Sequence, residues 1–311
     1  EILSEMILLA VGKDRKYMLI ALFGSTLISF APLFYKYSAT NPVTGAFFRM
    51  AYALPVLALL VYFLKSKDSR SSKSRWLAFS AGLLLSLDFI SYHTAIDYVG
   101  TGIATMIGNS QVLIVTLVSW KFLGEKPNKS ILLSLPIVIL GLALISGIWD
   151  NNPYGEDPLR GVITGILAAI FYSSFLILYR YSNREMAPAQ NLQFDATSGA
   201  AIGLLIIGLL PLQFLSIESI DLQPVWPGHA WLILLAIFCQ AAGWMAITYA
   251  LPRLPAADTS FAVLLQPVLT IIWGLLLLNE NPSIQQSAGI ILILGSVIAV
   301  TAFGNTEVTT D

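Results

Sequence analysis

Asp88 is a carboxylate inside a long apolar stretch of the sequence. Ser91 and Tyr92 follow it at i+3 and i+4, so on a helix the three side chains would form one polar stripe. A carboxylate in such surroundings is costly to bury and could bind a cation or exchange a proton; a buried structural pair is the alternative. His93 lies five residues after Asp88, about 140° around a helix, which excludes a couple between them on one face.

Glutamine side chains recur at matching depths of the apolar segments. Gln111 and Gln266 each lie about 10 residues, or roughly 15 Å of helix, from the end of a segment. Gln240 precedes Trp244 by one turn, which adds an amide and an aromatic ring on one face. Such amides either contact a substrate or hydrogen-bond between helices, and both roles stay open. The predicted substrate-binding residues are Asp88, Tyr92, Asn109, Gln111, Gln240, Trp244 and Gln266.

The elements that must hold these side chains are membrane helices. The chain has 311 residues, of which 56% are hydrophobic and 11% are charged, against about 25% charged in an ordinary soluble domain. Its mean hydropathy of +0.76 is too high for one anchor or signal segment to explain. A formal net charge of -1 argues against nucleic acid as a partner. The single cysteine, Cys239, cannot form an internal disulfide.

Ten apolar segments have about the 20 residues that a membrane-crossing helix needs, and none alternates as a barrel strand does. Their expected limits are 17–35, 43–64, 76–96, 101–120, 131–149, 161–179, 190–212, 230–251, 256–278 and 283–303. The sequence therefore predicts an all-α integral membrane protein with ten transmembrane helices.

Basic residues set the expected orientation, because Lys and Arg accumulate on the cytoplasmic side. With the N-terminus inside, all of the 17 lysines and arginines except Lys36, Arg49 and Arg160 fall at cytoplasmic ends of the segments. An even number of crossings then places both termini in the cytoplasm.

The two halves of the chain match at a constant shift, which places Gln111 on Gln266 without a gap. A second match sets Tyr35-Lys36-Tyr37-Ser38 over Tyr179-Arg180-Tyr181-Ser182. Because five helices is an odd number, the second copy enters the membrane from the opposite side, as an inverted repeat. The expected parts are a cytoplasmic tail at 1–16, a first five-helix repeat at 17–149, an external linker at 150–160, a second repeat at 161–303 and a cytoplasmic tail at 304–311.

Four further residues are predicted to gate the site or to compensate charge: Arg49, His93, Asp97 and Asp195. His93 faces Asp97 at i+4 near the outer end of its helix, where a surface gate and a solvated pair are both open. Arg49 and Asp195 coincide when the halves are aligned, but inversion puts them on opposite sides of the midplane. Each therefore needs another counter-charge or water.

Paired motifs lie at equivalent places in the two halves. They are Leu123-Gly124-Glu125-Lys126-Pro127 and Leu278-Asn279-Glu280-Asn281-Pro282, with the Gln266-Pro267 step, Arg49, Gly141 and Gly295. Through them the chain resembles the drug/metabolite transporter superfamily in its ten-helix EamA-type members, whose relatives include amino-acid exporters and nucleotide-sugar transporters; this implies secondary transport of a small solute. Val112 stands where the second copy has Pro267, so the first copy lacks the proline that a gating kink would use. Glu125 and Glu280 end helices at opposite faces, where they would cap loops in preference to latching gates.

These observations predict a secondary transporter that moves a small amphipathic metabolite by alternating access, with export as the expected direction. Amino acids or their derivatives come first, because Asp88 and the amides could receive an ammonium group, Arg49 a carboxylate or phosphate, and aromatic rings an apolar portion. Nucleotide-type metabolites are the alternative, followed by a membrane-embedded enzyme that uses Asp88. The sequence contains no nucleotide-binding loop and no zinc-ligand spacing, and no cofactor or metal is expected.

The expected partners are a small-molecule substrate, the lipid bilayer and, through Asp88, a coupled proton. Small residues spaced four apart, at Gly161 and Gly165 and at Gly199 and Gly203, suit close helix packing inside the bundle or in a dimer. The chain is therefore expected as a monomer or homodimer. Its expected location is the bacterial inner (plasma) membrane, as a multi-pass protein.

Overall fold

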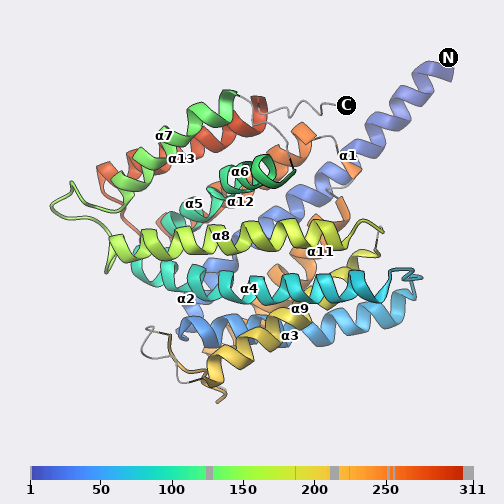
Figure 1. The fold of residues 1–311 in the computed structure, drawn as a ribbon, viewed down its shortest axis with the longest axis horizontal. Coiled ribbons are helices and arrows are strands. Elements are labelled where there is room, and N and C mark those ends of the chain that lie inside the picture. The colour runs from blue at the N-terminus through green and yellow to red at the C-terminus, as the bar shows by residue number, and fades with distance from the viewer. Residues whose placement is uncertain are drawn as a thin grey trace.

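The computed structural model describes the backbone of residues 2–123, 129–185, 187–210, 217–223, 225–250, 253–254 and 256–303. Side chains are described in the same ranges except at 2–14, 116, 119, 122–123, 129–131, 256–261 and 300–303. Across these ranges the regular structure is entirely helical (Figure 1).

The helices make ten segments, because α1 continues into α2, α5 into α6, and α10 through the π-helix η2 into α11. They are α1 (Ile2–Ser29), α2 (Ala31–Ser38), α3 (Pro42–Leu64), α4 (Ser72–Val99), α5 (Thr101–Asn109), α6 (Gln111–Leu123), α7 (Lys129–Ile145), α8 (Pro158–Ser182), α9 (Ala189–Leu209), α10 (Gly228–Leu234), η2 (Leu235–Gly243), α11 (Trp244–Ala250), α12 (Ala256–Leu277) and α13 (Ile284–Phe303). In the described part of the chain, 6 segments are long and apolar enough to cross a membrane, and shorter apolar helices account for the others. The order agrees with the ten predicted segments.

Three of the segments are interrupted. Pro32 lies in the first turn of α2, where its missing N–H is tolerated and its fixed φ suits a new helix start. Ser110 separates α5 from α6 although no proline lies there, whereas α12 continues through Pro267. The interrupted copy is therefore the first, contrary to the expectation from its missing proline. The third interruption is η2, whose π-helical winding is of a kind often found at functional sites.

Helix packing repeats between the two halves. α3 packs on α9, α5 on α12 and α7 on α13, and each pair joins a helix to its counterpart in the other half. Other contacts of one repeat have an equivalent in the other. The contact of α4 with α8 corresponds to that of η2 and α11 with α1, and the contact of α4 with α9 corresponds to that of η2 with α3 (Figure 1). This arrangement is that of two inverted five-helix repeats.

Small residues let α4 and α9 approach backbone to backbone. A Cβ at Gly82 would lie 2.0 Å from the carbonyl oxygen of Ala196, and a Cβ at Gly199 would lie 2.0 Å from that of Phe79. The small-residue face that contains Gly199 therefore packs inside the bundle, where close approach favours van der Waals contact between helices.

The carboxylate of Glu280, which is buried, ties α5 to the segment after α12 at one end of the bundle. It accepts hydrogen bonds from the Thr101 backbone N–H at 2.5 Å, the Thr101 hydroxyl at 2.8 Å and the Gly102 N–H at 3.1 Å. These backbone donors have no partner within their own helix, so Glu280 caps α5. Glu280 is thus a cap as expected, although for a helix and not for a loop; Glu125 lies outside the described residues.

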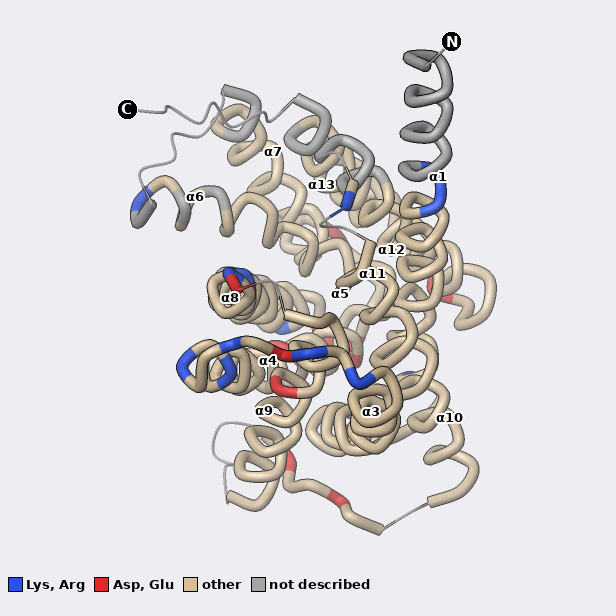
Figure 2. The backbone as a smooth tube through the Cα atoms, turned by 90° about the vertical axis from the view of Figure 1, so that its right-hand side faces the viewer, with Lys and Arg blue, Asp and Glu red and all other residues tan. Residues whose placement is uncertain are grey.

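The opposite end of the bundle carries a cluster of charges around the loop between α3 and α4. Arg70 donates to Asp68 at 2.9 Å and to Asp195 at 2.8 Å, and Glu185 accepts from the Ser71 N–H at 2.7 Å. Hydrogen bonds from Arg70 hold the pKa of Asp68 below its ordinary value, and the Ser71 N–H does the same for the pKa of Glu185. Figure 2 looks onto this end and shows Lys and Arg at the ends of α3, α4 and α8. It is the end that the charge distribution predicts to be cytoplasmic.

Candidate functional site

A cavity inside the bundle is lined by residues from both repeats. Its volume of about 110 Å³ is several times the roughly 15 Å³ that one water molecule needs. The lining residues are Ile28, Ala31, Pro32, Arg49, Asp88, Phe89, Tyr92, Thr105, Gly108, Asn109, Gln111, Ala168, Ala169, Tyr172, Trp244, Val263 and Gln266. Each interrupted segment reaches it: Pro32 lies at the α1–α2 break, Gln111 at the α5–α6 break and Trp244 at the end of η2. Irregular backbone at membrane depth is tolerated where it lines such a cavity.

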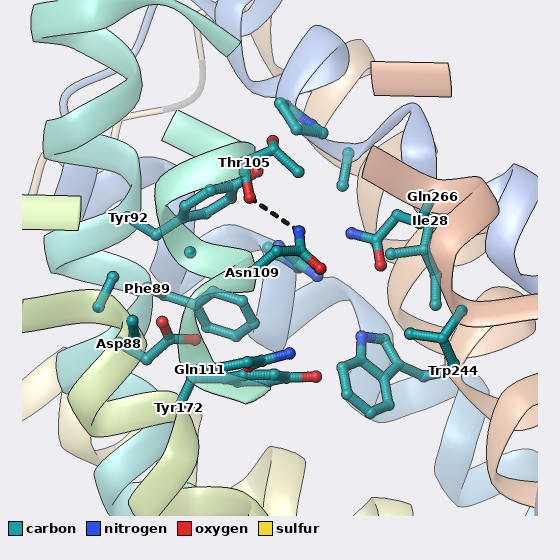
Figure 3. A pocket seen from close by; sticks show the side chains of 17 residues that line it. Ile28, Asp88, Phe89, Tyr92, Thr105, Asn109, Gln111, Tyr172, Trp244 and Gln266 are labelled. Carbon is teal, nitrogen blue, oxygen red and sulfur yellow. Dashed lines mark hydrogen bonds between the residues drawn. The ribbon is translucent and has the colours of Figure 1, made fainter. Parts of the chain in front are cut away.

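Six of the seven predicted substrate-binding residues line this cavity, and Figure 3 shows them around it: Asp88, Tyr92, Asn109, Gln111, Trp244 and Gln266. The seventh, Gln240, is buried outside the lining and contacts Arg49. Gln240 and Trp244 therefore do not both line the cavity, because the side chain of Gln240 turns to Arg49 on α3. Arg49, predicted as a gate or charge-compensating residue, lies in the cavity wall itself.

Arg49 and Asp88 bring opposite charges to the same cavity, and both are buried. The Nε of Arg49 donates to Oε1 of Gln240 at 3.0 Å, and its Cζ lies 4.1 Å from the centre of the Phe89 ring. Asp88 lies within electrostatic range of Arg49. No ion pair joins the two within the described ranges, where the salt bridges involve other residues. The cavity thus offers a guanidinium and a carboxylate that do not neutralise each other by direct contact.

A chain of hydrogen bonds fixes the polar wall formed by α4 and α5. The Thr105 hydroxyl donates to the Thr101 carbonyl at 2.7 Å, so the Tyr92 hydroxyl, 2.7 Å from the Thr105 oxygen, is the donor in that pair. The Asn109 amide nitrogen donates to the Thr105 carbonyl at 2.8 Å. Because Glu280 caps the same helix at Thr101, these bonds connect the cavity wall to the end of the bundle.

Gln111 and Gln266 both face the cavity, one from each repeat (Figure 3). No hydrogen bond joins their side chains in the part of the chain that the structure describes. Oε1 of Gln111 is buried without a hydrogen-bond partner among the described residues. A buried acceptor without a partner costs about 1–3 kcal/mol, so it favours a ligand or water that donates to it.

His93 and Asp97 do not form the expected pair. His93 stacks on Tyr35 with ring centroids 3.9 Å apart, and its Nδ1 lies 3.2 Å from the Pro42 carbonyl oxygen. Asp97 accepts from the Tyr35 hydroxyl at 2.7 Å and from Lys36 at 3.1 Å. The reason is a contact between helices. Because α2 packs against α4, Tyr35 and Lys36 contact His93 and Asp97, which spacing along α4 alone would pair with each other.

Asp195 lies away from the cavity, at the charged end of the bundle, where Arg70 binds it at 2.8 Å. Arg49 and Asp195 have different partners, and of the two only Asp195 has a counter-charge in direct contact among the described residues. Asp195 compensates the charge of Arg70, and Arg49 contacts Gln240 and Phe89.

Tyr172 is a cavity residue that the sequence analysis missed. It lies about 11 residues, or roughly 16 Å of helix, after Gly161, so its hydroxyl also falls inside an apolar segment. The match between the halves at Tyr35 and Tyr179 sets Tyr172 over Ile28, which also lines the cavity. Both signals were present in the sequence.

A family model described as the EamA-like transporter family matches residues 15–147 and 159–302, once in each half of the chain. The chain belongs to the EamA-like transporter family. The resemblance inferred from the paired helix ends is therefore confirmed, together with the ten-helix fold in two repeats. This EamA-like protein is a multi-pass membrane transporter.

Its relatives include proteins described as uncharacterized transporters. One from Helicobacter pylori (strain ATCC 700392 / 26695) is 26% identical over 298 residues, which cover 90% of this chain and 96% of that protein. Another from Archaeoglobus fulgidus is 25% identical over 285 residues, 88% of this chain and 93% of that protein. A solved crystal structure with 17% sequence identity has the same fold, with a TM-score of 0.63 over 93% of this chain and 97% of the other.

Proposed function

We propose that this transporter is a secondary carrier for a small amphipathic metabolite, an amino acid or an amino-acid derivative. The observation that carries the proposal is that Arg49 and Asp88, both buried, line one cavity without forming an ion pair with each other. Two opposite charges that lack a direct ion pair in a low-dielectric site suit a ligand that itself carries both charges.

Each part of such a ligand has a matching group in the wall. The guanidinium of Arg49 would bind the carboxylate, and Asp88 with the Asn109 amide oxygen would bind the ammonium group. Tyr172 and Trp244, whose ring centroids are 6.2 Å apart, would contact an apolar side chain. A bound ligand of this kind would give each of the two charges an opposite charge in direct contact.

Nucleotide-type metabolites fit the cavity less well. A phosphate or diphosphate brings more negative charge than Arg49 alone can balance, and Asp88 on the same wall would repel it. A membrane-embedded enzyme built on Asp88 and His93 is also disfavoured, because His93 lies outside the lining with its Nδ1 at the Pro42 carbonyl. We therefore propose no catalytic activity and no cofactor or metal.

Alternating access would use the two inverted repeats, since one structural pattern then builds both an inner and an outer gate. On the side of Glu280, Trp273 donates to the Ser29 hydroxyl at 3.0 Å and stacks on Phe30, with ring centroids 4.8 Å apart. These contacts join α1 to α12 and would separate when that side opens. We propose export across a bacterial inner membrane, coupled to a proton that competes with the ligand for Asp88, by a monomer or homodimer.

Counterflow in proteoliposomes tests this function. Vesicles loaded with each L-amino acid in turn should accumulate the same labelled amino acid, with nucleosides, nucleotide sugars and quaternary amines as competitors. We expect an amino acid to be carried by the wild type and not by Arg49→Gln. Arg160→Gln is the matched control, because Arg160 is exposed and pairs with Asp157 on its own helix. Transport of a nucleotide sugar in the absence of amino-acid transport would contradict the proposal.

A further inference from the structure

Two contacts hold the guanidinium of Arg49 in one orientation. The Phe89 ring covers one face, with Cζ 4.1 Å from the ring centre. Oε1 of Gln240 accepts from Nε at 3.0 Å. The remaining edge carries the two terminal nitrogens, which can bind a carboxylate through two parallel hydrogen bonds while Nε is occupied. Gln240 thus leaves the bidentate edge of Arg49 free for a partner in the cavity.

Gln240 reaches Arg49 from the other repeat. It lies on η2 in the second repeat, whereas Arg49 on α3 and Phe89 on α4 belong to the first. Its side chain is buried and does not line the cavity, so its contact with Arg49 is the feature that relates it to the site. The hydrogen bond therefore crosses the interface between the repeats.

The neutral side chain at this position has a physical consequence. A glutamate in the same place would orient Arg49 equally well, but it would also neutralise the guanidinium and lower its attraction for an anion. An apolar residue would preserve the charge but leave Nε buried without an acceptor. A glutamine orients the guanidinium and preserves its charge, and both properties matter for binding a carboxylate.

We propose that Gln240 is a positioning residue that makes the cavity selective for ligands with a carboxylate. It holds Arg49 so that the terminal nitrogens face the ligand, and it sets the preference for an amino acid over the amine that lacks the carboxyl group. This role rests on the proposed function, since the ligand is taken to be an amino acid.

The test compares two glutamine substitutions. Gln240→Leu removes the acceptor from Arg49. Gln193→Leu is the matched control, because Gln193 is also buried, accepts a hydrogen bond from the Tyr179 hydroxyl at 2.9 Å, and lies outside the cavity lining. Dissociation constants are measured by titration calorimetry for L-leucine and L-phenylalanine, and for the amine that results from decarboxylating each.

We expect Gln240→Leu to raise the dissociation constant of the amino acids about tenfold and that of the amines less than about twofold. Gln193→Leu should leave the ratio between amino acid and amine as in the wild type. Gln240→Glu should weaken amino-acid binding and strengthen amine binding. A loss of packing would weaken both, so these opposite effects distinguish the two explanations. An unchanged ratio in both Gln240 variants, or an equal loss in Gln240→Leu and Gln193→Leu, would overturn the proposal.

A second readout needs no ligand. In protein labelled with ¹⁵N-arginine, the Nε–H of Arg49 should exchange slowly with water in the wild type and in Gln193→Leu, and at least tenfold faster in Gln240→Leu. If the wild type binds neither amino acid, the proposed substrate class is wrong while this exchange rate still decides the contact. Equal exchange in all three proteins would overturn the positioning role.

Discussion

The two repeats share one fold but contribute different chemistry to the cavity. The shift that sets Gln111 on Gln266 also sets Phe89 on Trp244, and all four residues line the wall. Asp88, by contrast, aligns with Gly243, where an added Cβ would lie 2.7 Å from Ile28. These two positions, one amide and one aromatic, are therefore symmetric, whereas both charged lining residues, Arg49 and Asp88, come from the first repeat.

This difference separates two requirements of a carrier. In the proposed alternating-access cycle, symmetric positions would serve both conformations equally, because each repeat would take the place of the other when the carrier changes state. Ligand orientation requires asymmetry, since a carboxylate and an ammonium group must find different partners. We infer that the first repeat recognises charge and that the second supplies apolar contact and, through Gln240, the orientation of Arg49.

The comparison of the two repeats depends on their inverted orientation in the membrane. A topology test therefore has the largest expected effect. Reporters fused after Lys73 and Arg184 are expected to read cytoplasmic, and reporters after Asp150 and Glu218 external, because basic residues gather at the first two sites. The signal is all or none. A reporter after Arg184 that reads external would contradict the inverted arrangement.

Because the first repeat supplies the charged residues of the cavity, Asp88→Asn is expected to have a large effect on transport. If Asp88 exchanges a proton or a cation, the substitution should reduce transport driven by a pH gradient at least about a hundredfold, while counterflow without net proton movement survives. Asp97→Asn is the control on the same helix, because Asp97 binds Tyr35 and Lys36 outside the cavity. Normal transport by Asp88→Asn at every pH from about 5.5 to 8 would assign the residue a structural role; a size-exclusion profile checks the fold.

The sequence predicts the fold well because membrane helices are specified by composition over some twenty residues, a signal that survives local error. It also places most of the cavity wall, since a polar side chain at mid-membrane needs a partner or a cavity. Gln240 and the His93–Asp97 pair were assigned wrong neighbours for one reason. Spacing along one helix was used in both cases, whereas the partner comes from another helix: Arg49 on α3 for Gln240, and Tyr35 on α2 for His93 and Asp97.

Tertiary contacts of this kind have no local signal. Tyr35 meets His93 only after α2 has turned at Pro32 and packed on α4, so spacing along α4 alone could not predict the stack. Tyr172 differs, because its depth and its alignment with Ile28 were both readable before the structure was known.

Phe89 and Trp244, which occupy equivalent positions in the two repeats, predict effects of intermediate size on ligand affinity. Phe89→Leu removes the ring beneath Arg49, a contact worth about 0.5–2 kcal/mol, and should weaken the binding of all amino acids by about twofold to thirtyfold. Trp244→Leu should weaken only ligands with large apolar side chains, because Trp244 packs against the ring of Tyr172. Calorimetric titration of glycine and leucine measures both. Equal losses for glycine in the two variants would contradict the division of roles between the repeats.

The smallest effects are expected at the symmetric amides, where they test whether the pair acts as helix glue or as ligand contacts. Gln111→Ala removes a buried acceptor that has no partner among the described residues, so the melting temperature should stay within about 2 °C of the wild type. Affinity for the amino acid should fall about threefold in Gln111→Ala and about threefold in Gln266→Ala, because each removes one neutral hydrogen bond to the ligand. The double substitution should be additive, since no hydrogen bond connects the two side chains in the described structure. A lowered melting temperature in both single variants, with a double variant no worse than either, would show that the two amides bind each other and would remove them from the ligand site.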